Sequence, residues 1–288
     1  MLEIEHILFP VDFSERTCGA APFVDAMAKR FHADVTLLNV VNPIPYIGLD
    51  PPYPSTICDE SELKADAQER LEGALVKELA DVPVQRIAEV GEPAAVITQF
   101  AHTRGVGLIM MPTHGYGPFR RFLLGSVTAK VLHDAECPVW TGAHMEQRPA
   151  LDHVGCKAVL CAVDGTPRSE PVISWAADFA KRAGATLRLV HVVPAIEGWP
   201  ERQFDREYED NLRTKARTEI ERILEQLGID TPLCVVAGSV AAAVRDEAGG
   251  HGADLLVIGR GAAHEGLGRL RMHAYGIIRE APCPVISV

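Results

Sequence analysis

A glycine-rich stretch near the middle of the chain has residue types and spacing suited to holding an anion. The run MPTHG at residues 111–115 is followed, after nine residues, by Gly125-Ser126. Glycines permit left-handed φ and a close approach of the backbone to a phosphate. Free N–H groups near Gly125 and Ser126, with the serine hydroxyl, are suited to bind phosphate oxygens at the start of a helix. Plain turn glycines explain the same spacing, and both interpretations stay open.

The segments around this stretch alternate between strand and helix patterns, which predicts a parallel sheet with helices on both faces. The ligands of such sheets bind beyond the carboxyl ends of the strands, where the strand order reverses. We expect strands at Ile4–Val11, Asp34–Val41, Val84–Val90, Gly107–Met111 and Pro138–Thr141, and helices at Ser14–Phe31, Asp59–Ala80, Ala94–Thr103 with Pro93 in its first turn, and Phe119–Asp134.

The whole pattern occurs twice. The run HILFPVD at 6–12 matches AVLCAVD at 158–164, and ADVTLLNVV at 33–41 matches the run at 185–193, both 152 residues later. Towards the end of each half ECPV matches PCPV at an offset of 146 residues. The period is far longer than that of solenoid repeats, so each copy is expected to be a domain with its own core. We expect an aperiodic linker at 142–155, with domains at 1–143 and 154–288.

The repeated motifs resemble those of the universal stress protein family. The resemblance rests on ILFPVDFS, LLNVV and the run from LIMMPTHG to LLGSVTAKVLHDAECPVW, and it covers nearly all of both copies. It implies an α/β fold of two tandem Rossmann-like (adenine nucleotide α-hydrolase-like) domains, each a five-stranded parallel sheet flanked by helices. It also implies an adenine nucleotide as ligand: ATP, with ADP, AMP and a role for Mg²⁺ left open.

The resemblance assigns the ligand contacts residue by residue. In the first copy the adenosine end is expected to meet Pro10, Val11, Asp12 and Val40, and the ribose and phosphates to meet Met111, Gly115, Gly125, Ser126 and Val127. In the second copy the corresponding candidates are Asp164, Val192, Gly259 and Gly261. Asp12 has two possible roles that the sequence does not separate, because a carboxylate after a strand accepts from a nucleoside or caps the following helix.

Two departures from the family pattern bear on the ligand. The motif's first glycine is Pro112 here, which has no N–H and a fixed φ. In the second copy Arg271-Met272 replaces Gly-Ser, so a side chain projects where backbone should approach a phosphate. We therefore expect nucleotide mainly in the first domain. Arg260 in the second copy is expected either to bind an anion in another way or to belong to a solvated basic patch.

Composition excludes several classes of function. The formal charge of −11 argues against a nucleic-acid partner, which needs concentrated Lys and Arg. There is no run long and apolar enough for a membrane span and no signal-peptide pattern. Seven cysteines form no CxxC pair, so we expect free thiols, no metal site and a cytoplasmic location.

Three functions remain open. The first is a stress-response regulatory protein that binds nucleotide without efficient catalysis, since no acid, base and nucleophile are assembled. The second is a slow ATPase, and the third is an interaction module that binds no nucleotide, which Pro112 favours. The family resemblance also implies that the apolar strands at Pro138–Thr141 and Pro284–Val288 pair across the two domains as an intrachain pseudo-dimer. A homodimer of chains stays open.

Overall fold

The computed structural model describes residues 3–43, 59–113, 124–142, 154–195, 203–260 and 269–288. Within these ranges each half contributes five parallel strands. Those of the first half are β1 (His6–Pro10), β2 (Asp34–Val41), β3 (Val84–Val90), β4 (Leu108–Pro112) and β5 (Val139–Gly142). Those of the second half are β6 (Ala158–Val163), β7 (Thr186–Val193), β8 (Leu233–Ala237), β9 (Leu255–Ile258) and β10 (Val285–Ser287). The predicted α/β fold of two tandem domains is confirmed.

The two five-stranded sheets join into one ten-stranded sheet, with the order β3-β2-β1-β4-β5-β10-β9-β6-β7-β8. The junction is antiparallel and pairs Trp140 with Ile286, whereas every other pairing is parallel. The expected pairing of the two Cys-Pro-Val strands across the domains is therefore confirmed. Neither strand is left as an open edge, which removes a site for aggregation.

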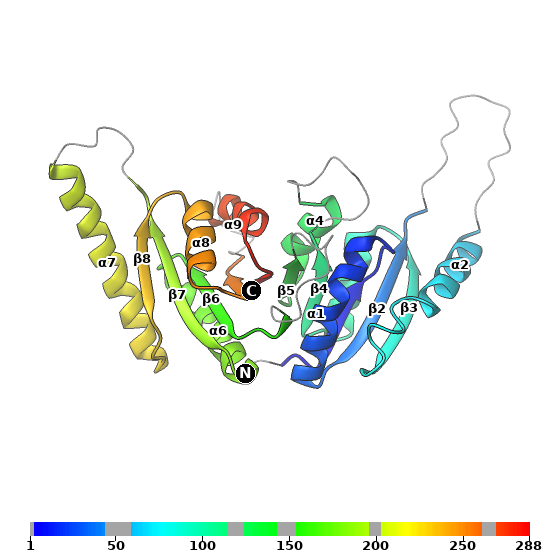
Figure 1. Cartoon of the computed structure of the whole chain (residues 1–288). Coiled ribbons are helices and arrows are strands. Elements are labelled where there is room, and N and C mark those ends of the chain that lie inside the picture. Colours follow the sequence, from blue (N-terminus) through cyan, green and yellow to red (C-terminus); the bar gives the residue numbers. More distant parts are fainter. Residues whose placement is uncertain (1–2, 44–58, 114–123, 143–153, 196–202, 261–268) are drawn as a thin grey trace, which may run out of the picture.

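Helices cover both faces of this sheet (Figure 1). One face buries the larger aromatic side chains, among them Phe9, Phe23, Trp140 and Phe179, and the other is lined mainly by aliphatic residues. The first face packs against α1 (Glu15–Phe31), α2 (Glu60–Glu72), α6 (Ser169–Ala183) and α7 (Gln203–Leu227). The second face packs against α3 (Pro93–Thr103), α4 (Ser126–Asp134), α8 (Val240–Gly250) and α9 (Arg269–Glu280).

Local sequence signals explain the helix ends. Ser14 caps α1 by accepting a hydrogen bond from the Thr17 N–H, and His32 closes the helix in the left-handed region at φ 55°. Pro93 is the first residue of α3, where its missing N–H costs no hydrogen bond. The Glu92 carboxylate caps the same helix. Its hydrogen bond from the Ala95 N–H and, to a smaller extent, that from Lys130 hold the pKa of Glu92 below the ordinary value.

Two predicted helices are shorter than expected. The helix expected over Asp59–Ala80 ends at Glu72, and the chain continues through turns to β3. The helix expected over Phe119–Asp134 begins at Ser126, because residues 124 and 125 are not helical, while residues 119–123 lie outside the described part. Gly125 is therefore the N-cap residue of α4, and Ser126 is the first residue of the helix.

Candidate functional site

The strand order reverses next to β1. The chain passes from β1 to β2 and β3 on one side, whereas β4 pairs with β1 on the other side. Crevices at such switch points, beyond the carboxyl ends of the strands, bind ligands in open α/β sheets. The structure places the predicted adenosine residues at these ends: Pro10, Val11 and Asp12 at and after the end of β1, and Val40 near the end of β2. Met111 is buried and is the residue before the last one of β4.

Asp12 organises the first turn of α1. Its Oδ1 accepts hydrogen bonds from the Ser14 N–H at 3.0 Å, from the Ser14 hydroxyl at 2.6 Å and from the Thr17 hydroxyl at 2.6 Å. Of the two roles considered for this carboxylate, support of the helix start is therefore present in the structure. All three bonds end on Oδ1, and Asp12 is an exposed residue, so the second role, accepting a hydrogen bond from a nucleoside, would fall to Oδ2.

Asn39 fixes the loop from the other side. This residue is buried in β2, and its Nδ2 donates to the carbonyl oxygen of Val11 at 2.7 Å. The Val11 N–H donates to the Leu38 carbonyl oxygen at 2.8 Å, so both backbone groups of Val11 are satisfied. Asn39 was not among the predicted site residues, although an amide within an apolar strand is itself a signal, because a buried polar side chain requires a partner.

Phe13 is a second residue that sequence reasoning missed. It follows Asp12 with φ 60°, a left-handed conformation that is unfavourable for an aromatic residue. The Arg70 guanidinium lies 4.2 Å from the centroid of its ring, a cation–π arrangement. The second copy has Gly165 at the equivalent position with φ 71°. That glycine was the available signal, since it marks a backbone conformation that both copies share.

The start of α4 supplies backbone donors. Gly125 is the N-cap residue and provides no side-chain cap, and the first intrahelical bond runs from the Ala129 N–H to the Gly125 carbonyl at 2.8 Å. The N–H groups of Ser126, Val127 and Thr128 consequently have no acceptor within the helix. Ser126 is exposed and Val127 is half-buried. This is the arrangement in which a helix binds an anion.

One expectation for Gly125 is wrong: its N–H is not free, because it donates to the carbonyl oxygen of Thr113 at 2.8 Å. Gly125 has φ −61° and so does not use the left-handed conformation that glycine permits; what it offers here is its missing side chain. The candidate donors are thus Ser126, Val127 and Thr128. Gly115 lies outside the described residues.

Pro112 does not disturb the sheet. The Thr113 N–H donates to the Gly142 carbonyl of β5 at 3.1 Å, and successive N–H groups along a strand point to opposite sides. The nitrogen of Pro112 therefore faces β1, whose pairing with β4 ends at Ile109. The missing N–H removes no ladder hydrogen bond. The Pro112 carbonyl accepts from the Thr128 hydroxyl at 3.2 Å, which ties α4 to the end of β4.

The second domain repeats the first loop closely. Oδ1 of Asp164 accepts from the Thr166 N–H at 3.0 Å, the Thr166 hydroxyl at 2.8 Å and the Ser169 hydroxyl at 2.6 Å. Partial burial acts to raise the pKa of Asp164, but the hydrogen bonds from Ser169 and Thr166 together lower it by more. The pKa of Asp164 therefore lies below the ordinary value. His191 takes the place of Asn39, with Nδ1 2.9 Å from the Val163 carbonyl oxygen, and the half-buried Val192 follows it.

The phosphate end of the second domain differs. The helix α9 begins at Arg269, so Arg271 and Met272 lie within its first turn, whereas the aligned Gly125-Ser126 begins α4. The backbone of the second domain is therefore already helical at the positions that align with Gly125 and Ser126, where the first domain begins its helix. Gly259 is half-buried at the end of β9, and Gly261 lies outside the described residues.

Both expectations for Arg260 are wrong. Its guanidinium donates to the carbonyl oxygens of Ala135 and Cys137 in the first domain, at 2.8 Å each. The side chain is partly buried, and this burial lowers its pKa. Arg260 is therefore a contact between the domains and not part of a solvated patch or an anion site.

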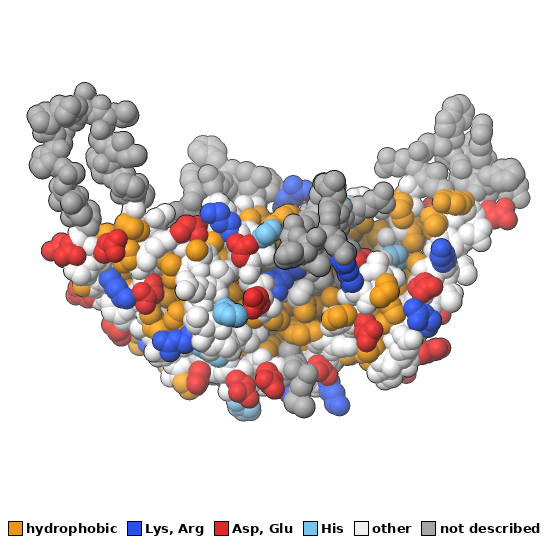
Figure 2. Space-filling model, turned by 180° about the vertical axis from the view of Figure 1, so that it is seen from behind, with side chains coloured by type: hydrophobic (Ala, Val, Ile, Leu, Met, Phe, Trp, Pro, Cys, Tyr) orange, Lys and Arg blue, Asp and Glu red, His pale blue; other side chains and the backbone are white. Residues whose placement is uncertain are grey.

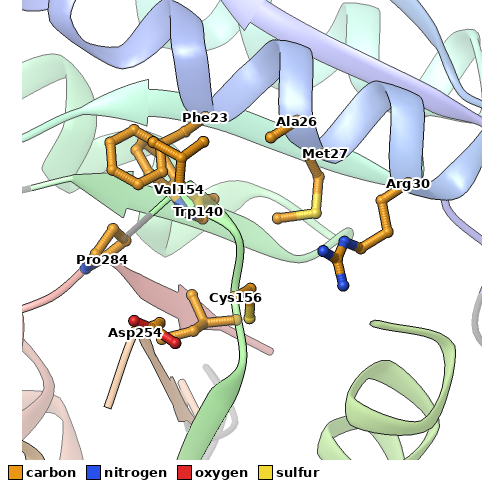
Figure 3. Close-up of a pocket in the computed structure, with 10 residues that line it drawn as sticks. Phe23, Ala26, Met27, Arg30, Trp140, Val154, Cys156, Asp254 and Pro284 are labelled. Carbon is orange, nitrogen blue, oxygen red and sulfur yellow. The ribbon is translucent and has the colours of Figure 1, made fainter. Parts of the chain in front are cut away.

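The surface shows no basic stripe on the face seen in Figure 2, where acidic and basic side chains are intermixed over the described residues. A small, partly open hollow lies between the domains and shares no residue with the predicted nucleotide site (Figure 3). Its walls combine α1 and β5 of the first domain with three parts of the second, namely its start, the beginning of β9 and the residue before β10: Phe23, Ala26, Met27, Arg30, Trp140, Val154, Cys156, Asp254, Leu255 and Pro284.

The described cysteines are free thiols, and no group of His, Cys, Asp and Glu within the described ranges is arranged to hold a metal ion. Burial raises the pKa of Cys156, Cys161 and Cys283 to about 12 in each case. These thiols are therefore protonated and poorly nucleophilic at neutral pH. None of the described helices is long and apolar enough to cross a membrane.

The fold is an α/β sheet with a switch point in each half, the place where the ligands of such folds bind. Comparison with known proteins gives the family. The model of the universal stress protein family matches residues 3–141 and 155–288, and the chain belongs to this family.

Relatives match either one copy or both. A universal stress protein of Methanocaldococcus jannaschii, MJ0531, is 36% identical over 136 residues, covering 46% of this chain and 78% of the relative. A universal stress protein of Mycolicibacterium smegmatis is 28% identical over 190 residues, covering 65% of this chain and 63% of the relative. The crystal structure of a universal stress protein from Archaeoglobus fulgidus covers 99% of this chain and 96% of its own, with TM-score 0.69 and 21% identity. That likeness shows that the tandem fold is shared.

Proposed function

We propose that the chain is a nucleotide-responsive regulatory protein whose first domain binds an adenine nucleotide, with ATP as the expected ligand. The observation that carries the proposal is the start of α4. There Gly125 offers no capping side chain, and the N–H groups of Ser126, Val127 and Thr128 have no acceptor within the helix. A phosphate completes such a helix start and benefits from the helix dipole.

The adenosine end of the ligand is supported by the β1 loop. Both the N–H and the carbonyl group of Val11 are hydrogen-bonded to residues of β2, so the loop after β1 is formed before a ligand arrives. A preformed loop loses less entropy on binding. The Oδ2 of Asp12 is left to accept from a ribose or adenine donor, and Val40 offers an apolar contact. Any Mg²⁺ would be held between the phosphates and the Ser126 hydroxyl.

The proposed output is a change of conformation or partner and not a product. An alternative is an interaction module that binds no nucleotide. It is favoured by one observation, the bond from the Gly125 N–H to Thr113, which removes a donor that the phosphate was expected to use. Slow ATP hydrolysis is the remaining alternative, and it is tested by following phosphate release in the same samples.

The test is calorimetric titration of the intact chain with ATP, ADP and AMP, with and without Mg²⁺. The site variant is Gly125→Arg, which places a long side chain over the first turn of α4. The control is Gly249→Arg, the same replacement at an exposed helical position of the second domain with open space around its Cβ. We expect about one site per chain, lost in Gly125→Arg and retained in Gly249→Arg. Absence of binding to the intact chain would favour the interaction module.

A further inference from the structure

Arg260 joins the two domains at one end of α4. It follows β9 in the second domain, and its N–H donates to the Val288 carbonyl at 3.0 Å, as the Thr113 N–H does to Gly142 in the first domain. The structure thus aligns Arg260 with Thr113 at the start of the loop expected to bind nucleotide. In the second domain the side chain at this position reaches across the interface, where its guanidinium donates to carbonyl oxygens of the first domain.

The contact is made with the carboxyl end of α4. Ala135 is the C-cap residue of this helix, and its carbonyl oxygen is one acceptor of the Arg260 guanidinium, with that of Cys137 as the other. Carbonyl groups at a helix end lack intrahelical donors, and a cation placed there is stabilised by the helix dipole. A bidentate arginine also fixes direction, since its two donors are coplanar.

A second bond from the same domain reaches the middle of the helix. The Tyr275 hydroxyl of α9 donates to the Ala129 carbonyl at 3.4 Å. The helices α4 and α9 lie next to each other on the same side of the sheet near the boundary of the two halves (Figure 1). The second domain therefore contacts α4 at its C-cap and along its length, while the amino end of the helix forms the candidate phosphate site.

We propose that Arg260 is a positioning residue for the nucleotide site of the first domain, through which the second domain sets the placement of α4. This inference rests on the proposed function for its effect on affinity. A helix of nine residues moves largely as a unit, so a hold on Ala135 constrains the donors of Ser126 and Val127 at the other end. The coupling is reciprocal, so a nucleotide at α4 also biases the contact of Arg260 with Ala135 and Cys137.

The chain offers a matched control. Arg30 of α1 also bridges the domains, donating to the carbonyl oxygens of Ala183 at the end of α6 and of Gly155. It is an arginine with two backbone carbonyl acceptors in the opposite domain, like Arg260, but it does not contact α4. Arg260→Met and Arg30→Met each remove one such bridge while keeping a side chain of similar length. Arg260→Lys restores the charge without the two coplanar donors.

The experiment has two readouts. Hydrogen exchange at the Ala129 amide reports the first turn of α4, because this N–H bonds to the Gly125 carbonyl. Calorimetry reports nucleotide affinity. We expect Arg260→Met to raise the exchange rate at Ala129 and the Kd for ATP by about 5-fold or more, the lower end of usual coupling free energies. Arg30→Met should leave both within about 2-fold of wild type, and Arg260→Lys should fall between.

The two proposals fail separately. If wild type binds no nucleotide, the proposed function fails, and exchange at Ala129 then decides only whether Arg260 holds α4 in place. Unchanged exchange in Arg260→Met, or an equal rise in Arg30→Met, would overturn the inference. It is also overturned if wild type binds nucleotide and Arg260→Met loosens α4 without any change in Kd.

Discussion

Asn39 holds the carbonyl oxygen of Val11 at 2.7 Å from a buried position in the neighbouring strand. His191 makes the corresponding contact with Val163 in the second domain, so two different side chains satisfy the same backbone group. The carbonyl lies one residue before the aspartate that organises the first helix of each domain. This side-chain contact therefore joins the core of the sheet to the loop that we expect to meet the nucleoside.

Replacing Asn39 tests that connection. Asn39→Leu keeps the size of the side chain but leaves the Val11 carbonyl without its donor. An unsatisfied buried polar group costs about 1–3 kcal/mol, so we expect a fall of that size in the free energy of unfolding by urea. Nucleotide affinity should fall as well. A variant as stable as wild type would mean that water or a backbone shift replaces the amide.

Asp164 predicts a dependence of stability on pH. Its pKa is depressed in the folded state, so its contribution to stability is present above the unfolded value, near 3.8, and is lost as pH falls through the lower folded pKa. Asp164→Asn should therefore unfold at a lower temperature than wild type at pH 7. The difference between the two melting temperatures should shrink below about pH 4. A difference that stays constant down to pH 2 would contradict the assignment.

Sequence patterns predicted most of the fold for a physical reason. Strands buried on both faces are continuous apolar runs, and the expected bounds of Asp34–Val41 match the structure to the residue. The bounds of Val84–Val90, a partly buried strand at the sheet edge, match as well. The helix expected over Asp59–Ala80 was too long, because its Glu, Lys and Leu pattern continues into turns that have the same composition. Helical periodicity does not by itself specify where a helix ends.

The candidate site was less predictable, because its geometry depends on bonds between segments far apart in the sequence. The spacing of Gly125-Ser126 indicated a helix start, but nothing local to it shows that the Gly125 N–H is taken by Thr113. Arg260 looked like a solvated or anion-binding arginine because its acceptors lie about 125 residues away, in the other domain. The repeat did carry usable information, since Gly165 marked the left-handed conformation of Phe13.

The repeat also provides a matched pair of glycines. Gly91 and Gly238 both follow the third strand of their domains, with φ 153° and 154°, a region that is unfavourable for other residues. A Cβ at Gly91 would lie 2.8 Å from Cγ2 of Val96, whereas at Gly238 the nearest atom is 3.9 Å away, the Cβ of Ala243.

Alanine at each position separates backbone strain from steric conflict. Both variants should lose about 1–3 kcal/mol to the backbone conformation. Gly91→Ala should lose about 1–3 kcal/mol more, because Val96 must move in a packed site. The measurement is urea unfolding of both variants, followed by the double variant Gly91→Ala with Val96→Ala. Equal losses at the two glycines would show that Val96 yields without cost.

The junction of the two halves gives the last prediction. Removing Pro284–Val288 deletes β10, which lies between β5 and β9 at the centre of the ten-stranded sheet. The loss exposes the ladder groups of two strands and the buried Trp140, which pairs with Ile286. Exposed apolar edges pair with other chains, so we expect insoluble or domain-swapped protein in sedimentation and size-exclusion experiments. Ile286→Val, which keeps the strand, is the control and should remain well folded with a loss of about 0.5–1.5 kcal/mol. A soluble truncated chain that unfolds cooperatively would mean that the first domain closes its own edge, and that the continuous sheet is not required for either half to fold.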